Sequence, residues 1–279
     1  MRITATSTAV GAELDDVDLS DLDDQTFGAI LEAFNQYGVL FFRDQSLSPE
    51  QHITFAERFG PININRFFHP VADHPQIAEV LKEPDQTQNI GGGWHTDHSY
   101  DVEPARCSIL YAHEVPDCGG DTLFAGMGAA FEALSPDFKA MLRTLQAEHS
   151  SRHVFGAAAL ADRGEIGERI GNPEAATQDV VHPVVIAHPE TGQELLYVNP
   201  GFTRRIHGWS DAESEALLQF LYTHAMSPVF HTRFHWQPGS LAMWDNRATW
   251  HYALNDYHGQ RRYLHRITVE GVPLRAAAA

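Results

Sequence analysis

The C-terminal stretch LAMWDNRATWHYALNDYHGQRRYLHRITVEG, residues 241–271, decides the fold class. It contains two runs of strand-forming residues, Leu241–Trp244 and Tyr263–Glu270, and the first of them ends at a turn signal, Asp245-Asn246. Short strands that alternate with turns are typical of antiparallel sheets, whereas strands that alternate with long helices indicate a parallel sheet. This stretch therefore argues against a parallel sheet of alternating strands and helices.

The rest of the chain adds more short strands and few helices. Strand-forming residues occupy Val39–Phe42, Ser108–Ala112, Val184–Ala187, Leu195–Asn199 and Phe230–Trp236, and the turn-forming segment Pro189–Gly192 predicts a hairpin. Apolar residues at helical spacing predict helices over Asp24–Gln36, from Ser48 onward and over Ser210–Ala225. We predict a mainly β fold with flanking helices, a jelly roll or barrel, and no parallel nucleotide-binding sheet.

Composition and charge restrict the classes of function. A chain of 279 residues with 43% hydrophobic residues can bury the core of one large domain, residues 1–279. Its net charge of −18 repels phosphate backbones and anionic lipids, so we expect no nucleic-acid partner and no membrane partner. The chain has no leader pattern, no long apolar run and two cysteines without a pairing pattern, which predicts a cytoplasmic protein.

Residues 155–180 form a long stretch with little periodicity. They are rich in alanine and glycine with scattered charges, which predicts a loop. An ordered domain usually keeps such a long loop for function, so we expect a lid over a binding site, with a disordered surface loop as the alternative. The terminal Ala276–Ala279 is expected to be frayed.

The candidate metal ligands begin with His95 and Asp97 in GGGWHTDHSY, residues 91–100. With 17 histidines in the chain, roughly one His-x-Asp triplet arises by chance, so the triplet needs support from elsewhere. On an extended segment the two side chains point the same way, and two histidines plus one carboxylate form the facial site of non-haem iron(II) oxygenases. His251, His258 and His265 are candidates for the third ligand, and His251, which follows a strand and a turn, is the best of them.

Two arginines share one face of the last predicted strand. Arg262 and Arg266 alternate with Tyr263 and His265, and four strand steps separate the two arginines by about 13 Å. Arginines on an inner face need buried partners, so this pattern indicates the binding of two different anions rather than core packing.

With these residues in place, the chain resembles the Fe(II)/2-oxoglutarate-dependent dioxygenases of the taurine dioxygenase family (TauD/TfdA), which includes the 2,4-D-type herbicide dioxygenases. The similar blocks run in order along almost the whole chain and include GAELDDVDLS, VLFFRDQ, QHITFAERFG, WHTD, GGDTLF, LYVNPGFTRRI, WDNRATWHY and NDYHGQRRYLHR. The resemblance implies a double-stranded β-helix (jelly roll, cupin-like), an Fe(II) cofactor, and 2-oxoglutarate and O2 as co-substrates.

The resemblance also implies roles for single residues. His95, Asp97 and His251 match the catalytic iron ligands of the family, and Thr122 and Arg262 match the residues that hold the distal carboxylate of 2-oxoglutarate. Arg266 is similar in position to the arginine that binds the sulfonate or carboxylate of the substrate. The remaining substrate-binding candidates are Phe155 and Phe202, which match aromatic residues of the taurine pocket, and Asn65 and His69.

The implied function is the hydroxylation of a small anionic organic substrate, in first place a sulfonate such as taurine or a relative, with release of sulfite and an aldehyde. Two departures from the taurine enzymes concern the substrate: Gly91–Gly93 replaces a polar run, and the His-Pro pair after Gly60 is displaced. The same chemistry on an aryloxyalkanoate or another carboxylate, and a non-catalytic cupin-like binding protein, therefore stay open as alternatives. We further expect a homo-oligomer, a dimer or a tetramer.

Overall fold

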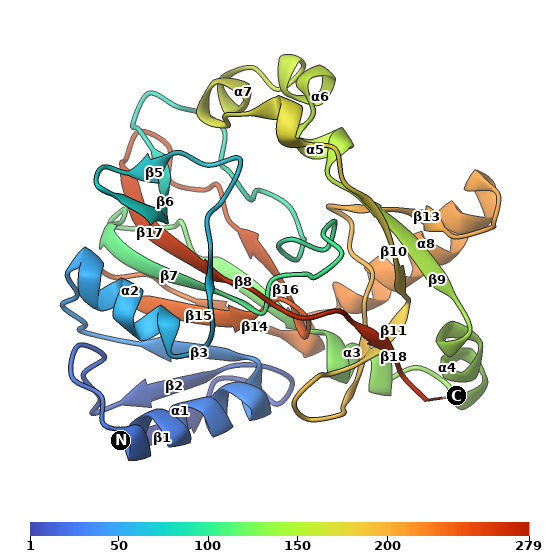
Figure 1. Cartoon of the computed structure of the whole chain (residues 1–279), viewed down its shortest axis with the longest axis horizontal. Coiled ribbons are helices and arrows are strands. Elements are labelled where there is room, and N and C mark those ends of the chain that lie inside the picture. Colours follow the sequence, from blue (N-terminus) through green and yellow to red (C-terminus); the bar gives the residue numbers. More distant parts are fainter. Residues whose placement is uncertain (279) are drawn as a thin grey trace.

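The computed structural model describes residues 1–278 and consists of short strands with helices on the outside (Figure 1). The strands are β1 (Arg2–Ala5), β2 (Ala12–Asp15), β3 (Val39–Phe42), β4 (Ile62–Asn63), β5 (Pro70–Val71), β6 (His74–Lys82), β7 (Cys107–Glu114), β8 (Thr122–Gly126), β9 (Gln146–Ser150), β10 (Asp179–Pro183), β11 (Val185–Ala187), β12 (Glu194–Leu196), β13 (Thr203–Ile206), β14 (His231–Phe234), β15 (Leu241–Asp245), β16 (Thr249–Ala253), β17 (Arg262–Val269) and β18 (Arg275–Ala276). The helices are α1 (Asp24–Tyr37), α2 (Pro49–Glu57), α3 (Met127–Glu132), α4 (Pro136–Arg143), α5 (Arg152–Phe155), α6 (Ala157–Ala161), α7 (Glu165–Arg169) and α8 (Asp211–Ala225), with the 3-10 turns η1 (Pro173–Ala175) and η2 (Pro228–Phe230).

Two sheets provide the frame of the molecule. The larger sheet has the strand order β1-β2-β3-β15-β7-β17-β6-β5, with β4 on β17, and the smaller one has the order β14-β8-β16. Side chains from both sheets, among them Phe41, Phe124, Trp244 and Leu264, form one buried apolar cluster. This arrangement confirms the predicted double-stranded β-helix. The described strand pairs are antiparallel except β2 with β3, which are parallel.

Two strands of residues 241–271, β15 and β17, lie inside the larger sheet, and the third, β16, is an edge strand of the smaller sheet. β15 pairs with β3 and β7, and β17 pairs with β7 and β6. The predicted hairpin at Pro189–Gly192 joins β11 to β12. The strand predicted over Leu195–Asn199 is shorter than expected and ends at Leu196, because Asn199 begins a turn: its carbonyl accepts the Thr203 N–H at 3.1 Å.

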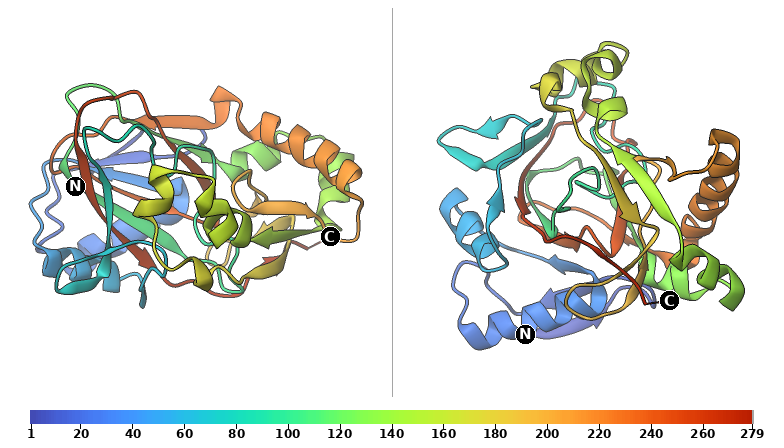
Figure 2. Two further views of the ribbon diagram at one scale, coloured as in Figure 1. Left: turned by 90° about the horizontal axis from the view of Figure 1, so that it is seen from above. Right: turned by 45° about the vertical axis from the view of Figure 1, so that its right-hand side comes forward.

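The helices lie outside the strands in three groups, which the right-hand view of Figure 2 separates. α1 and α2 cover the outer face of the larger sheet, where Phe34 and Phe55 are buried against Leu40 and Phe42. Capping follows the sequence: Ser48 and Ser210 each form a capping box at the start of α2 and α8. These caps satisfy free backbone N–H groups and explain why the two helices begin where predicted.

The structure corrects two expectations about irregular segments. Residues 155–180 are not a plain loop, because α6, α7 and η1 lie within them and their apolar residues Leu160, Ile170 and Ala176 are buried against Phe67 and Phe155. Ala276 is not frayed, because it pairs with Ile186 between β18 and β11. Contacts with distant residues explain both differences: Phe67 packs against the segment 155–180, and Ile186 pairs with Ala276. Local sequence does not predict either contact.

No helix within residues 1–278 combines the length and the apolar character needed to cross a lipid bilayer.

Candidate metal centre and its cavity

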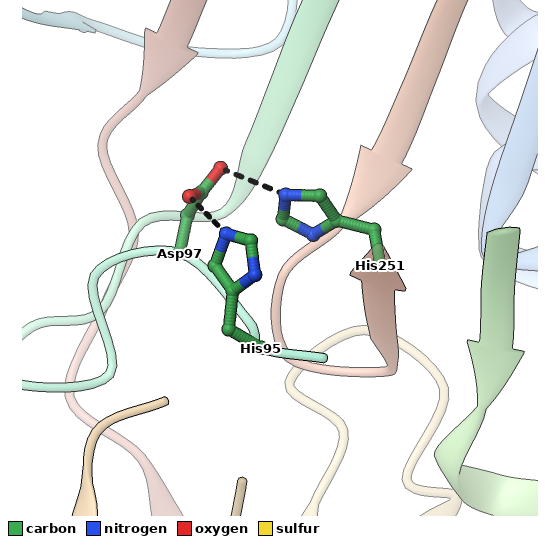
Figure 3. Close-up of side chains that lie close together, drawn as sticks. All are labelled: His95, Asp97 and His251. Carbon is green, nitrogen blue, oxygen red and sulfur yellow. Dashed lines mark ion pairs between the residues drawn. The ribbon is translucent and has the colours of Figure 1, made fainter. Parts of the chain in front are cut away.

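The candidate metal ligands His95, Asp97 and His251 converge on one point, although His251 follows the other two by about 150 residues in sequence (Figure 3). Nε2 of His95 lies 3.7 Å from Oδ1 of Asp97, and Nε2 of His251 lies 4.0 Å from Oδ2. One ligand atom of each residue lies within 4.8 Å of the other two. Three such atoms can bind a single metal ion from one side and leave its opposite side free for other ligands. The other two candidate histidines lie elsewhere: His258 is exposed, and His265 packs against His113.

Backbone pairing brings the two histidines together. The N–H of His95 donates to the carbonyl of His251 at 3.1 Å, and the N–H of His251 donates back at 2.8 Å. Nδ1 of His95 lies 2.8 Å from the carbonyl of Gly93. A carbonyl only accepts hydrogen bonds, so Nδ1 carries the proton and Nε2 presents its lone pair to the metal position.

The electrostatics of the site favour the forms that bind a metal. Burial, assisted by the nearby His95, lowers the pKa of His251 well below its usual value, so this imidazole stays neutral. Burial alone would raise the pKa of Asp97, but the Arg266 guanidinium outweighs it and holds this pKa below its usual range. A neutral imidazole and an ionised carboxylate are the states that metal ions require.

Two glycines permit the close packing around His95. Gly91 has a φ of +77°, a conformation that L side chains rarely adopt, and its carbonyl accepts the Ala253 N–H. At Gly201 a Cβ atom would lie 2.7 Å from the Cβ of His95. The positive φ and the close packing therefore give a structural reason for glycine at Gly91.

Arg262 is a buried cation that has no ion-pair partner among residues 1–278. Its side chain lies in the interior at 4% exposure, and neither Nε nor Nη2 has a hydrogen-bond partner in residues 1–278. The guanidinium lies 5.6 Å from the centre of the Trp236 ring, and Trp236 in turn donates to Oγ1 of Thr122 at 2.9 Å. A buried arginine with two free donors fits a carboxylate ligand, which agrees with the distal carboxylate of 2-oxoglutarate.

Arg266 lies deeper along the same face of β17. Its Nη1 lies 3.5 Å from the Asp97 carboxylate, its guanidinium stacks at 4.4 Å over the Phe68 ring, and its Nε has no partner in the described chain. Arg261, by contrast, points to the other side and pairs with Glu83 and Glu114. The predicted alternation of the strand is confirmed.

These side chains line a cavity of about 540 Å³, a size that suits a small organic ligand. The wall is mostly apolar and includes Phe68, Val80, Ile90, Leu110, Ile166 and Ile170. Among the lining residues that the structure describes, Asp97 is the only acidic one, and Arg163, Arg262 and Arg266 are the cations. The cavity therefore suits an anion with an apolar body.

The other predicted substrate residues divide into two groups. Phe155, Phe202 and Asn65 line the cavity, although the side-chain oxygen of Asn65 already accepts the N–H groups of Phe67 and Phe68. His69 is exposed and does not line the cavity, so its prediction is corrected. Its carbonyl accepts the Glu79 N–H at 2.9 Å, which ties this backbone to β6 and leaves the ring outside.

Sequence reasoning missed several residues of the site. Arg163 and Ile166 reach the cavity from the segment predicted as a lid, and Tyr100 and His153 line it as well. Ser108 contacts Asp97 from β7. A polar residue in the apolar run CSILYA was the available signal for Ser108, whereas nothing local marks Arg163 as facing inward.

Comparison with known proteins gives consistent results. A family model described as "Taurine catabolism dioxygenase TauD, TfdA family" matches residues 2–268. An alkylsulfatase of Acinetobacter baylyi is 35% identical over 267 residues, which cover 94% of this chain and 82% of the relative. An (S)-phenoxypropionate/alpha-ketoglutarate-dioxygenase of Sphingobium herbicidovorans is 34% identical over 96% of this chain and 94% of its own length. The crystal structure of a taurine dioxygenase from Burkholderia xenovorans superposes with a TM-score of 0.83 at 35% identity, covering 99% of this chain and 92% of that one.

Proposed function

Since this chain belongs to the TauD, TfdA family of dioxygenases, we propose that it hydroxylates a sulfonate or sulfate ester that has an apolar body. The chain is an Fe(II)- and 2-oxoglutarate-dependent oxidoreductase, which sets aside the non-catalytic alternative. The observation that carries the proposal is the pairing of the His95, Asp97 and His251 cluster with two inward arginines.

We assign the residues of this chain the following roles. His95, Asp97 and His251 would hold Fe(II), and Arg262 with Thr122 would hold the distal carboxylate of 2-oxoglutarate. When bound, the iron and 2-oxoglutarate supply the oxidising power with O2, and 2-oxoglutarate leaves as succinate and carbon dioxide. Arg266 would bind the anionic head of the substrate and so determine which carbon faces the metal, while Phe155, Phe202 and Asn65 shape the pocket.

The product follows from the position of the hydroxyl group. If the hydroxylated carbon bears a sulfonate, the C–S bond breaks to give an aldehyde and sulfite. If it bears a sulfate ester oxygen, the C–O bond breaks and sulfate leaves instead. An aryloxyalkanoate would release a phenol by the same route, so the released group identifies the substrate class.

The apolar wall predicts a preference against amines. We expect kcat/KM for hexyl sulfate or hexanesulfonate to exceed that for taurine by about tenfold or more, because an ammonium group buried without an acidic partner costs at least about 1.4 kcal/mol. Asp97, the one acidic group lining the cavity among the described residues, is assigned to the metal. Succinate release measured across these substrates and a phenoxypropionate checks the prediction; taurine as the best substrate would refute the proposed class.

Substitutions of Arg262 and Arg266 are expected to impair different steps, the binding of 2-oxoglutarate and the response to substrate. Arg262→Met should weaken 2-oxoglutarate binding by about 3 kcal/mol or more, because it leaves the distal carboxylate buried without its partner. Arg266→Met should retain the visible absorption of the anaerobic iron and 2-oxoglutarate complex and lose the stimulation of succinate release by substrate. Anaerobic titration followed by absorption spectroscopy measures both effects, and an equal loss of 2-oxoglutarate affinity in the two variants would contradict the assignment.

We also propose that residues 1–279 act as one dioxygenase domain and that the segment 155–180 acts as its lid. Ile166, Ile170 and Arg163 support this role, because they reach the cavity from that segment. We propose a cytoplasmic enzyme that works as a homo-oligomer, a dimer or tetramer, on a small molecule; its charge of −18 argues against nucleic acid.

A further inference from the structure

We propose that Ser108 and Asn246 are positioning residues that hold one oxygen of Asp97 away from the metal position. This inference rests on the proposed iron site. It concerns a chain of hydrogen bonds behind the three ligands, in which Ser108 and Asn246 have so far been given no role.

Ser108 makes a short contact to the metal-ligand carboxylate. Its Oγ donates to Oδ2 of Asp97 at 2.7 Å, and the serine is completely buried on β7, between β15 and β17. Water cannot replace this bond at full burial. A charge-assisted hydrogen bond of this length restricts the rotation of the carboxylate.

Asn246 determines the direction of that bond. Its Nδ2 lies 3.2 Å from Oγ of Ser108, with the amide oriented so that the NH2 group faces the hydroxyl. An amide NH2 can only donate, so the serine oxygen accepts there and its single proton is left for Asp97. Asn246 therefore acts on the metal ligand through Ser108.

The backbone of Asn246 is itself held by two hydrogen bonds. Its N–H donates to the carbonyl of Arg106 at 3.0 Å, and its carbonyl accepts the hydroxyl of Thr96, the residue between His95 and Asp97. It also lies between Asp245 and Arg247, which form a buried ion pair. The turn from β15 to β16 thus connects the His95–Asp97 segment to the strand of His251.

The consequence concerns how the carboxylate can bind. A facial site must keep three positions open for 2-oxoglutarate and O2, and a carboxylate that binds through both oxygens would occupy one of them. With Oδ2 engaged by Ser108, Oδ1 is the oxygen left for the metal. Without Ser108, the nearest competing donor is Nη1 of Arg266, which lies 3.5 Å from both oxygens.

The test uses Co(II) alone as the probe of the metal-free protein. Ser108→Ala should weaken Co(II) binding by about 10- to 100-fold, the usual effect of removing a partner of a metal ligand, and should change the intensity of the d–d absorption bands. Ser240→Ala is the matched control. Ser240 is equally buried, and its hydroxyl bonds to Arg43 and Gln237 far from the ligands, so its loss should leave Co(II) binding unchanged.

Asn246→Asp tests the direction of the chain of bonds, because a carboxylate accepts where the amide donates and diverts the serine proton from Asp97. It should weaken Co(II) binding in the wild-type background and have little further effect in the Ser108→Ala background. Co(II) affinity of Ser108→Ala equal to that of wild type, or independent effects of the two substitutions, would overturn the proposal. If wild-type protein fails to bind Co(II) at one site, the proposed iron site fails instead. Circular dichroism checks folding. Ser108→Thr, which keeps the hydroxyl, should bind Co(II) more tightly than Ser108→Ala and close to the wild-type affinity.

Discussion

Asp97→Asn is expected to lose iron binding and, with it, all turnover. The amide keeps the size of the side chain but not its charge, so the site would lose its anionic ligand while the Arg266 cation stays beside it, 3.5 Å from the position of that carboxylate. Removing a residue that only hydrogen-bonds to a metal ligand lowers metal affinity by about 10- to 100-fold. Removing the anionic ligand itself should therefore lower it by more than about 100-fold. Succinate release in the presence of substrate should fall to the background.

Metal-dependent stability provides a second measurement on the same variant. A metal at 100 times its dissociation constant stabilises the wild-type fold by about 2.7 kcal/mol, and the variant should gain almost nothing at that concentration. Asp101→Asn is the matched control, because Asp101 pairs with Arg66 and His98 and does not line the cavity. An Asp97→Asn protein that retains metal-dependent thermal stabilisation would contradict the assignment of this carboxylate.

The sequence singled out the three residues that converge in the structure, because the chemistry expected of metal ligands is strict. Only a few residue types bind iron, and Arg262 and Arg266 are unusual on an inward strand face, so each pattern supported the other. His69 failed for the opposite reason. Its role depended on the path of an irregular loop, and that path is fixed in part by the bond from the Glu79 N–H to the His69 carbonyl, which local sequence patterns do not predict.

The same distinction between local and distant determinants applies to the helices and strands of the fold. The starts of α2 and α8, which have capping boxes, were predicted to the residue, because local spacing and local hydrogen bonds determine them. The helices α6 and α7 were not predicted, because they are short and their few apolar residues pack against side chains such as Phe67, which lies far earlier in the sequence. Arg163 was missed at the site for the same physical reason, whereas Ser108 had a local signal, a polar residue in an apolar run, that was not used.

The turn between β15 and β16 carries a buried ion pair on which the fold depends. Arg247 and Asp245 are each 1% exposed, and Nη2 of Arg247 lies 2.6 Å from Oδ2 of Asp245. Burial alone would raise the pKa of Asp245, but Arg247 and His188 hold it below its usual range. Glu190 adds a second, partly exposed carboxylate at 2.9 Å from Arg247. The network closes the turn that leads from Trp244 to His251.

Arg247→Met should therefore reduce the free energy of unfolding by about 3–5 kcal/mol, because it leaves Asp245 charged and buried without its main partner. Urea denaturation measures the loss. Arg205→Met removes an ion pair to Glu148 in which the arginine side chain is 47% exposed, and it should cost less than about 1 kcal/mol. Adding Asp245→Asn to Arg247→Met should recover part of the stability, since no uncompensated charge then remains. If Arg247→Met costs no more than Arg205→Met, the buried pair does not stabilise the turn, and the backbone bonds around Asn246 must hold the two ligand segments together by themselves.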